Sequence, residues 1–257
     1  MKILMLLFFI LGLLTSQNLF AQFAKRKVGE TYSEAKFRSF GKNYKKKNLK
    51  TSAENTKVEL ANIDFKSVPN YETLENINKL YLKLRDMKPM KDPEFEKKSR
   101  RLSWMYPDDG CFARAALMVK SFEKWKLPLP KKLFIFGNLK VQTDFNPRGE
   151  VRWWYHVVPT VRAGKDVYVI DPSIENTRPL TIKEWTLRQV PEIKNARFSL
   201  CHSLAYSPSS KCLTKPSTNP NDRAIKDQIT YLKLERKRLK SLDFNVDDLL
   251  GEQPPWK

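Results

Sequence analysis

The stretch WWYHVVPTVRAGKDVYVID, residues 153–171, decides the fold of this chain. Apolar and β-branched residues dominate both of its halves, and Ala163-Gly164-Lys165-Asp166 separates them. This pattern predicts a β-hairpin with strands at residues 151–161 and 167–170. The first strand nevertheless contains His156, and the second ends at Asp171. A polar side chain that is buried in an apolar strand needs a partner, so these two residues are expected to pair.

The turn of the hairpin decides whether His156 and Asp171 can meet. In an antiparallel pair the numbers of directly opposed residues have a constant sum. A turn at residues 163–164 gives a sum of 327 and places His156 directly opposite Asp171. A turn at residues 164–165 gives 329 and leaves the two as diagonal neighbours on one face. Only a turn with an odd number of residues would put them on opposite faces, so Asp171 is expected to orient His156.

A helix is predicted to begin at Cys111, because apolar residues recur at helical spacing from there to Trp125. A cysteine in the first turn of a helix lies near free backbone N–H groups and the positive end of the helix dipole. These can lower a thiol pKa from about 8.5 into the range of about 3.5–7.5. Gly110 allows a tight turn, and Asp108 or Asp109 is expected to cap the helix. Cys111 is therefore predicted to be an activated nucleophile whose neighbouring N–H groups can hold an oxyanion.

Cys111, His156 and Asp171 together have the chemistry of a thiol acyl-transfer site. A nucleophilic cysteine needs a base within hydrogen-bond reach, and the base needs an orienting group. The order Cys, His, Asp is that of a transglutaminase-like or papain-like thiol acyl-transfer site. The predicted fold is α+β, with a core in which the nucleophile helix packs on an antiparallel sheet. The alternative is purely structural, with a core histidine, an aspartate that ends a strand, and an inert buried thiol.

The other two cysteines predict a disulfide. Cys201 and Cys212 lie eleven positions apart, and closing such a loop contributes about 3 kcal/mol in the loop-entropy model. Cys111 is then the odd thiol. His202, beside Cys201, is interpreted as a structural or surface residue. The sequence has no CxxC, no HExxH and no glycine-rich phosphate loop, so neither a metal nor a cofactor is expected.

The beginning of the chain has the pattern of a signal peptide at residues 1–21. Lys2 precedes an apolar run, residues 3–14, that is too short to span a bilayer, and Ala21 offers a cleavage position. The mature protein is therefore expected to be secreted or periplasmic, with no integral membrane span. The net charge of +20 would attract anionic surfaces, although scattered solvated lysines are the preferred interpretation.

The remaining segments are assigned from periodicity and composition. Residues 22–50 are basic and poor in apolar side chains, which is typical of a flexible arm or a pro-segment. Residues 58–63 alternate as a strand does, and residues 71–87 have the spacing of an amphipathic helix. The patterns further predict a strand at residues 132–139, a short helix from Thr181 with Glu184 as its capping-box partner, a linker at residues 207–222, and a basic helix at residues 223–242 with Ile225, Ile229, Leu232 and Leu239 on one side.

Three stretches resemble motifs of the bacterial protein-glutaminases, a family of secreted protein-deamidating enzymes. They are YPDDGCFARA at residues 106–115, WYHVVP at residues 154–159 and VIDPS at residues 169–173, in that order. The resemblance covers roughly residues 92–215. It implies a transglutaminase-like fold, with Cys111 as the nucleophile, His156 as the general acid/base and Asp171 as the residue that orients it. It also implies that family members carry a pro-segment that covers the active site.

The resulting division of the chain has four parts. They are the signal peptide at residues 1–21, an N-terminal extension and candidate pro-segment at residues 22–91, a catalytic domain at residues 92–215, and a linker with a basic C-terminal helix at residues 216–257. Such an enzyme would hydrolyse exposed glutamine side chains of proteins to glutamate and ammonia. The same triad could instead transfer the acyl group to lysine, as a transglutaminase does, or cleave peptide bonds. A non-enzymatic basic surface-binding module is the alternative from a different class.

Overall fold

The computed structural model describes residues 24–40, 50–216 and 219–257, so the predicted signal peptide lies outside the described residues. The helices are α2 (Tyr32–Phe40), α4 (Leu74–Asp86), α5 (Cys111–Lys124), α6 (Ile182–Leu187), α7 (Asn221–Ser241) and α8 (Val246–Leu250). Short 3₁₀ turns are η2 (Leu60–Asn62), η3 (Phe65–Ser67) and η4 (Ile193–Asn195). The strands are β1 (Met90–Lys91), β2 (Ser99–Arg100), β3 (Lys131–Gln142), β4 (Glu150–Ala163), β5 (Asp166–Val169), β6 (Leu180–Thr181) and β7 (Arg197–Cys201).

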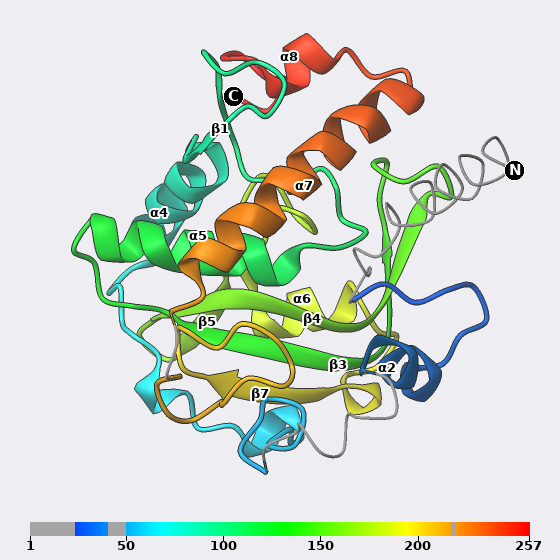
Figure 1. Ribbon diagram of the computed structural model, residues 1–257. Helices are drawn as coiled ribbons and strands as arrows, with labels where there is room; N and C mark the ends of the chain where they lie inside the picture. The colour runs from blue at the N-terminus through cyan, green and yellow to red at the C-terminus, as the bar shows by residue number, and fades with distance from the viewer. Residues whose placement is uncertain (1–23, 41–49, 217–218) are drawn as a thin grey trace, which may run out of the picture.

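A five-stranded antiparallel sheet forms the centre of the molecule, in the order β6-β5-β4-β3-β7. Helix α5 runs along this sheet at β4, and α7 crosses α5 (Figure 1). The apolar side chains of β3, β4 and α5 form one continuous core. The predicted α+β fold, with the nucleophile helix packed on an antiparallel sheet, is therefore confirmed.

The β4–β5 hairpin adopts the second of the two turns considered from the sequence. Arg162 faces Val167 and Ala163 faces Asp166, so opposed residues sum to 329. The pairing continues one step beyond β5, where the amide of Ile170 donates to the carbonyl oxygen of Pro159 at 3.0 Å. Asp171 therefore follows directly after the last paired residue and lies diagonal to His156.

Helix α4 belongs to the same core as the sheet. The predicted helix at residues 71–87 is confirmed, and the Thr73 hydroxyl caps it by accepting from the Asn76 amide. Its buried face presents Ile77, Tyr81 and Leu84 to the core that contains β4. The compact unit thus begins well before residue 92.

The extension at residues 22–50 is not a free arm where the structure describes it. Ala24 and Ala35 are fully buried, and Lys25 forms a β-bridge with Trp153 of β4. Arg26 donates hydrogen bonds to the carbonyl oxygens of Trp153 and Leu139. The basic composition was misleading because long cationic side chains can dock on backbone carbonyls while their apolar stems pack.

The strand predicted at residues 58–63 is wrong. Only Val58 pairs, through reciprocal 2.8 Å backbone hydrogen bonds with Phe198 of β7. The chain then turns into η2, whose residues are not buried. Alternating polarity without burial of the apolar positions does not hold a strand against a sheet.

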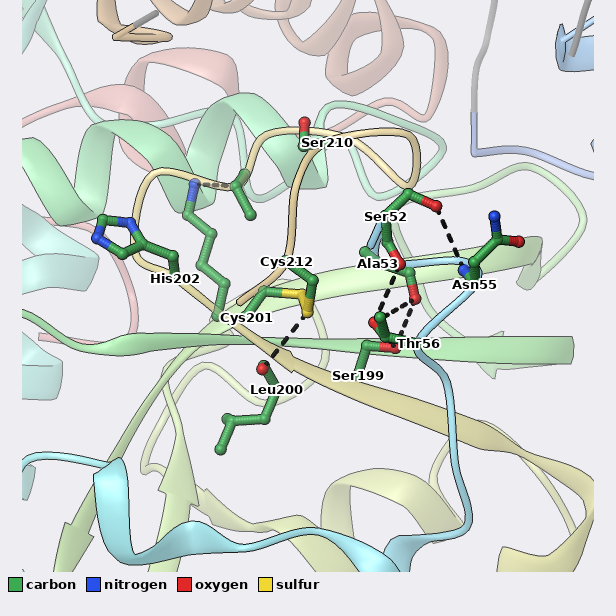
Figure 2. The surroundings of a disulfide bond; sticks show 12 residues. Ser52, Ala53, Asn55, Thr56, Ser199, Leu200, Cys201, His202, Ser210 and Cys212 are labelled. Atoms are coloured by element: carbon green, nitrogen blue, oxygen red, sulfur yellow. Dashed lines mark hydrogen bonds between the residues drawn. A yellow bond between two sulfur atoms is a disulfide. The ribbon is translucent and has the colours of Figure 1, made fainter. Parts of the chain in front are cut away.

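The predicted disulfide between Cys201 and Cys212 is present and joins the end of β7 to the following loop (Figure 2). Residues 51–54 run beside this loop: the amide of Ala53 donates to the carbonyl oxygen of Ser210 at 3.0 Å, and the amide of Cys212 donates to that of Thr51 at 2.9 Å. The first part of the predicted linker at 207–222 is therefore ordered structure. Within the described ranges, no helix is both long and apolar enough to cross a membrane.

We expect Ile77→Ala to lower the free energy of unfolding of the whole molecule by about 2–5 kcal/mol, because it leaves a cavity in the shared core. Tryptophan near-UV circular dichroism during urea unfolding would report the transition of the sheet. Leu74→Ala is the matched control, since Leu74 lies on the same helix but is 44% exposed. If Ile77→Ala leaves the transition seen by the tryptophan signal unchanged and destabilises only a separate transition, α4 forms a separate unit.

Candidate active site

Cys111 is the first residue of α5, as predicted, but neither aspartate caps the helix. The N-cap residue is Gly110, in the left-handed conformation with φ 83°. The Asp109 carboxylate instead accepts the Gly110 amide at 2.8 Å. A Cβ atom at Gly110 would lie 2.7 Å from the ring of Tyr231. Both the backbone conformation and the space therefore require glycine before Cys111.

Helix α7 holds the loop that precedes Cys111. The Gln228 amide donates to the Ser103 hydroxyl at 2.6 Å, and the Glu235 carboxylate accepts the Met105 amide at 2.9 Å. The Arg238 guanidinium donates to the Asp108 carboxylate at 2.6 Å. Residues 103–110, which we call the nucleophile loop, thus depend on side chains that lie outside the region of motif resemblance.

The predicted helix at residues 223–242 is confirmed, but its predicted apolar side is only partly right. Leu232 and Leu239 are fully buried, whereas Ile229 is exposed. Polar side chains of α7, Gln228 and Glu235 among them, occupy the buried face. A periodicity based on apolar residues could not find them, because their burial is compensated by hydrogen bonds to the nucleophile loop.

Arg114 supports the same loop from inside α5. Its guanidinium is buried and donates to the carbonyl oxygens of Ser103, Tyr106 and Asp109 at 2.8–3.3 Å. These contacts give this side chain a supporting role for the loop.

His156 and Asp171 form the predicted pair. The Nε2 atom of His156 lies 2.8 Å from an Asp171 carboxylate oxygen, and both side chains are buried. The same oxygen accepts the indole N–H of Trp185 at 2.8 Å, and the other accepts the Ser173 hydroxyl at 2.6 Å. Burial alone would raise the pKa of Asp171, but the charge and hydrogen bond of His156, with the Ser173 and Trp185 donors, lower it to about 2.

Two of these supporting residues were not assigned from the sequence. Trp185 was given no role, and Ser173 appeared only as part of the VIDPS motif. The available signal was the capping box of α6, which is present as predicted between Thr181 and Glu184. The capping box fixes the first turn of α6. Trp185 lies on this helix, is buried, and donates its indole N–H to Asp171.

The Cys111 sulfur lies within hydrogen-bond reach of the backbone of Val157 in β4, the residue that follows His156. A hydrogen bond from the Val157 backbone favours its thiolate form. Within the described part of the chain, the Nδ1 atom of His156 is buried without a hydrogen-bond partner. The ring nitrogen opposite Asp171 is thus available to exchange a proton with a reacting group.

The predicted activation of Cys111 is not found in this conformation. Burial raises the pKa of the thiol to about 12 and outweighs the opposing effects of Arg114 and of the Val157 hydrogen bond. The side chain is only 3% exposed. Desolvation of the anion therefore dominates over the helix terminus, so the thiol is neutral at ordinary pH.

Aromatic rings connect the two halves of the site. Trp153 stacks on His156 with ring centroids 4.6 Å apart, and its indole N–H donates to the carbonyl oxygen of Pro107 at 3.0 Å. A small cavity of about 120 Å³ lies beside Phe112, with Trp154 and Tyr206 among its walls and Phe40 of α2 at its edge. This cavity is thus lined in large part by aromatic side chains, among them that of the residue that follows Cys111.

The second histidine is not brought to this site. His202 lies in the disulfide loop, where its Nδ1 atom accepts the Leu204 amide at 3.1 Å. Burial and neighbouring lysines lower the pKa of His202. Among the residues that are described, no cluster of three or more histidine, cysteine or acidic side chains could hold a metal ion.

The low pKa of Asp171 predicts a defined loss of stability in acid. Its ionised form stabilises the folded chain above the unfolded-state pKa of about 4, and this contribution disappears as the pH falls toward 2. Between pH 5 and pH 2 the wild type should therefore lose on the order of 2 kcal/mol more than Asp171→Asn. Urea unfolding at several pH values measures the difference, and parallel curves for the two proteins would contradict the assignment.

The contact between α7 and the nucleophile loop predicts a contrast at Glu235, whose pKa burial raises to about 7. Glu235→Leu should cost about 1–3 kcal/mol, because it leaves the buried Met105 amide without an acceptor, and it should accelerate alkylation of Cys111 by iodoacetamide. Glu235→Gln keeps that acceptor and should change both quantities much less. Lys237→Ala, on the exposed side of α7, is the control. Equal behaviour of the Leu and Gln variants would exclude a positioning role.

One family model and several solved structures are similar to this chain. A family model described as glutaminase matches residues 77–189. Among solved structures, a pro-protein-glutaminase is 20% identical with a TM-score of 0.49, and the match covers 76% of this chain but only 66% of that one. A protein-glutaminase is 22% identical with a TM-score of 0.46, over 73% of this chain and 92% of that one.

The protein-glutaminase from Chryseobacterium proteolyticum is 23% identical, with a TM-score of 0.43 over 58% of this chain and 82% of that one. No curated protein is significantly similar to the chain. Because these TM-scores lie below 0.5, the assignment rests on the sequence model. That match begins inside α4, in agreement with the packing of this helix into the core. Residues 77–189 therefore match the glutaminase family model, in agreement with the resemblance to protein-glutaminases that the three motifs carry.

Proposed function

We propose that this protein is a protein-glutamine deamidase in which Cys111 is the nucleophile, His156 the general acid/base and Asp171 its orienting group. The observation that carries the proposal is the buried 2.8 Å contact between His156 and Asp171. It is supported by the Cys111 sulfur, which accepts a hydrogen bond from the backbone of Val157, the residue after His156. The glutaminase-family match supports the reaction class.

The reaction follows from these positions. Once the site opens to substrate, the Cys111 thiol transfers its proton to His156 and the thiolate attacks the carbonyl carbon of a glutamine side chain. Free N–H groups at the start of α5 stabilise the oxyanion. The C–N bond then breaks, and His156 protonates the departing ammonia. His156 next removes a proton from water, which hydrolyses the thioester to glutamate and restores the thiol.

Asp171 acts through His156. Its ionised carboxylate fixes Nε2 as the protonated ring nitrogen and leaves Nδ1 as the atom that exchanges protons. The donors from Ser173 and Trp185 keep the carboxylate charged, so it stabilises the imidazolium that forms during each step. Transfer to lysine or peptide-bond cleavage would use the same groups and differ only in the acceptor or in the bond that breaks.

The N-terminal extension fits the role of a segment that covers the site. Residues 24–40 contact β4 at Trp153 and Trp154, and Lys25 forms an ion pair with Asp108 of the nucleophile loop. The burial of Cys111 in the same structure is consistent with a closed form. We propose that residues 22–91 contain an inhibitory pro-segment, and that a signal peptide at residues 1–21 directs the protein to the periplasm or outside the cell.

The two histidines provide a matched test of the proposed reaction. Ammonia release from a glutamine-containing protein should fall by at least about a thousandfold in Cys111→Ala and His156→Asn, whereas His202→Asn should retain it. Each variant is assayed as the full chain and after limited proteolysis, with mass spectrometry of the substrate. Conversion of amide to acid without cross-links or chain cleavage identifies deamidation, and undiminished activity of Cys111→Ala would refute the proposal.

A further inference from the structure

A second cavity, of about 480 Å³, lies beside the nucleophile loop and has no place in the proposed reaction. It is bounded by the N-terminal segment, the turn at residues 146–148, β4 and α7. Three residues of its lining, Lys25, Asn146 and Arg238, donate to the buried carboxylate of Asp108. Its volume falls in the range typical of small-molecule sites.

The lining of this cavity is strongly basic. Its positively charged residues are Lys25, Arg26, Lys27, Arg38, Arg148, Arg152 and Arg238. Three carboxylates pair with members of this set: Asp108 with Lys25 and Arg238, Glu30 with Arg38, and Glu150 with Arg152. Seven positive charges against three negative ones leave a surplus of four, which favours an anion in the cavity.

The buried guanidinium of Arg26 makes the excess of positive charge unfavourable for the stability of the folded protein. This guanidinium donates to the carbonyl oxygens of Trp153, Leu139 and Glu30, but to no carboxylate in the described structure. Burial and then the nearby Arg152 lower the pKa of Arg26, and the charge of Glu30 opposes these two effects only in part. A buried cation whose charge is only partly compensated is destabilised, so a bound anion would stabilise it.

Two side chains at the rim are available to a ligand. Lys27 and Arg148 are exposed, and neither side chain forms a hydrogen bond or ion pair with the residues that the structure places. Arginine is the commonest lining residue, and its planar guanidinium binds phosphate or carboxylate oxygens in a bidentate manner. The lining contains no aromatic residue, whereas sites for single-stranded nucleic acid combine basic grooves with stacking rings.

The cations come from two parts of the chain. Lys25, Arg26, Lys27 and Arg38 belong to the N-terminal segment, and the other three belong to the body that carries Cys111. These two sets repel each other across the cavity. We infer that the cavity is a site for a multivalent anion with phosphate groups, and that this anion fastens the N-terminal segment to the catalytic body.

The inference is tested by binding of inorganic tripolyphosphate to the full chain, measured by calorimetry at fixed ionic strength against sodium chloride. Lys27→Glu/Arg148→Glu should weaken the affinity by about tenfold or more, because it reverses two available charges. Lys120→Glu/Lys183→Glu changes the net charge equally at exposed positions outside the cavity and should leave the affinity within about twofold. Equal weakening in both pairs, or no binding beyond that of chloride, would overturn the inference.

A second measurement tests the fastening of the N-terminal segment. A ligand that binds only the docked N-terminal segment stabilises the docked state. Tripolyphosphate should therefore slow proteolytic cleavage within residues 24–40 of the wild type. The effect should be far smaller in Lys27→Glu/Arg148→Glu. Unchanged cleavage at saturating ligand would refute the fastening. Phosphatidylglycerol vesicles form a third arm. If tripolyphosphate displaces the vesicles, the cavity binds the phosphate groups of a lipid surface as well. If the double substitution leaves vesicle binding unchanged, the vesicles bind elsewhere, which argues against the cavity as a phosphate site.

Discussion

The ring of Tyr231 lies against the backbone of Gly110, and the rest of the site depends on this contact. It leaves no room for a side chain at the residue before the nucleophile. Gly110 takes a left-handed conformation there, so that α5 begins at Cys111 and directs its first turn toward β4. The hydrogen bonds from Gln228, Glu235 and Arg238 hold the preceding loop in register with this turn. Cys111 is therefore positioned by a helix more than a hundred residues further along the chain.

The two ionisable groups at the centre of the site respond to burial in opposite ways. Asp171 keeps its charge because several donors converge on its two oxygens. The sulfur of Cys111 has much weaker compensation, and burial keeps its proton in place. The same apolar surroundings thus hold a permanent anion and a neutral acid close together, and the difference lies in the number of hydrogen bonds that each receives. Chemistry then requires either water or a substrate to reach the sulfur.

Much of this arrangement could be predicted from local sequence. The two apolar stretches on either side of Gly164 identify the hairpin. Because the numbers of opposed residues have a constant sum, both of the two-residue turns that were considered place His156 near Asp171. The start of α5 follows from periodicity after Gly110. Burial could not be predicted in this way, because the exposure of Cys111 depends on packing from distant segments. The role of α7 was hidden for a related reason: its functional contacts come from polar residues such as Glu235, which an apolar pattern counts as solvent-facing. Composition was least informative at Arg26, where a basic segment proved to be docked on backbone carbonyls.

The buried state of Cys111 also bears on how the chain oxidises. Thiol–disulfide exchange proceeds through the thiolate, and its rate falls when the attacking sulfur is protonated and inaccessible. With three cysteines in the chain, an exposed and ionised Cys111 would compete for Cys201 or Cys212 and scramble the bridge. Burial of Cys111 removes that competitor once the core has formed. It thus protects the correct cross-link and keeps the sulfur itself in its reduced state for as long as the thiol stays enclosed.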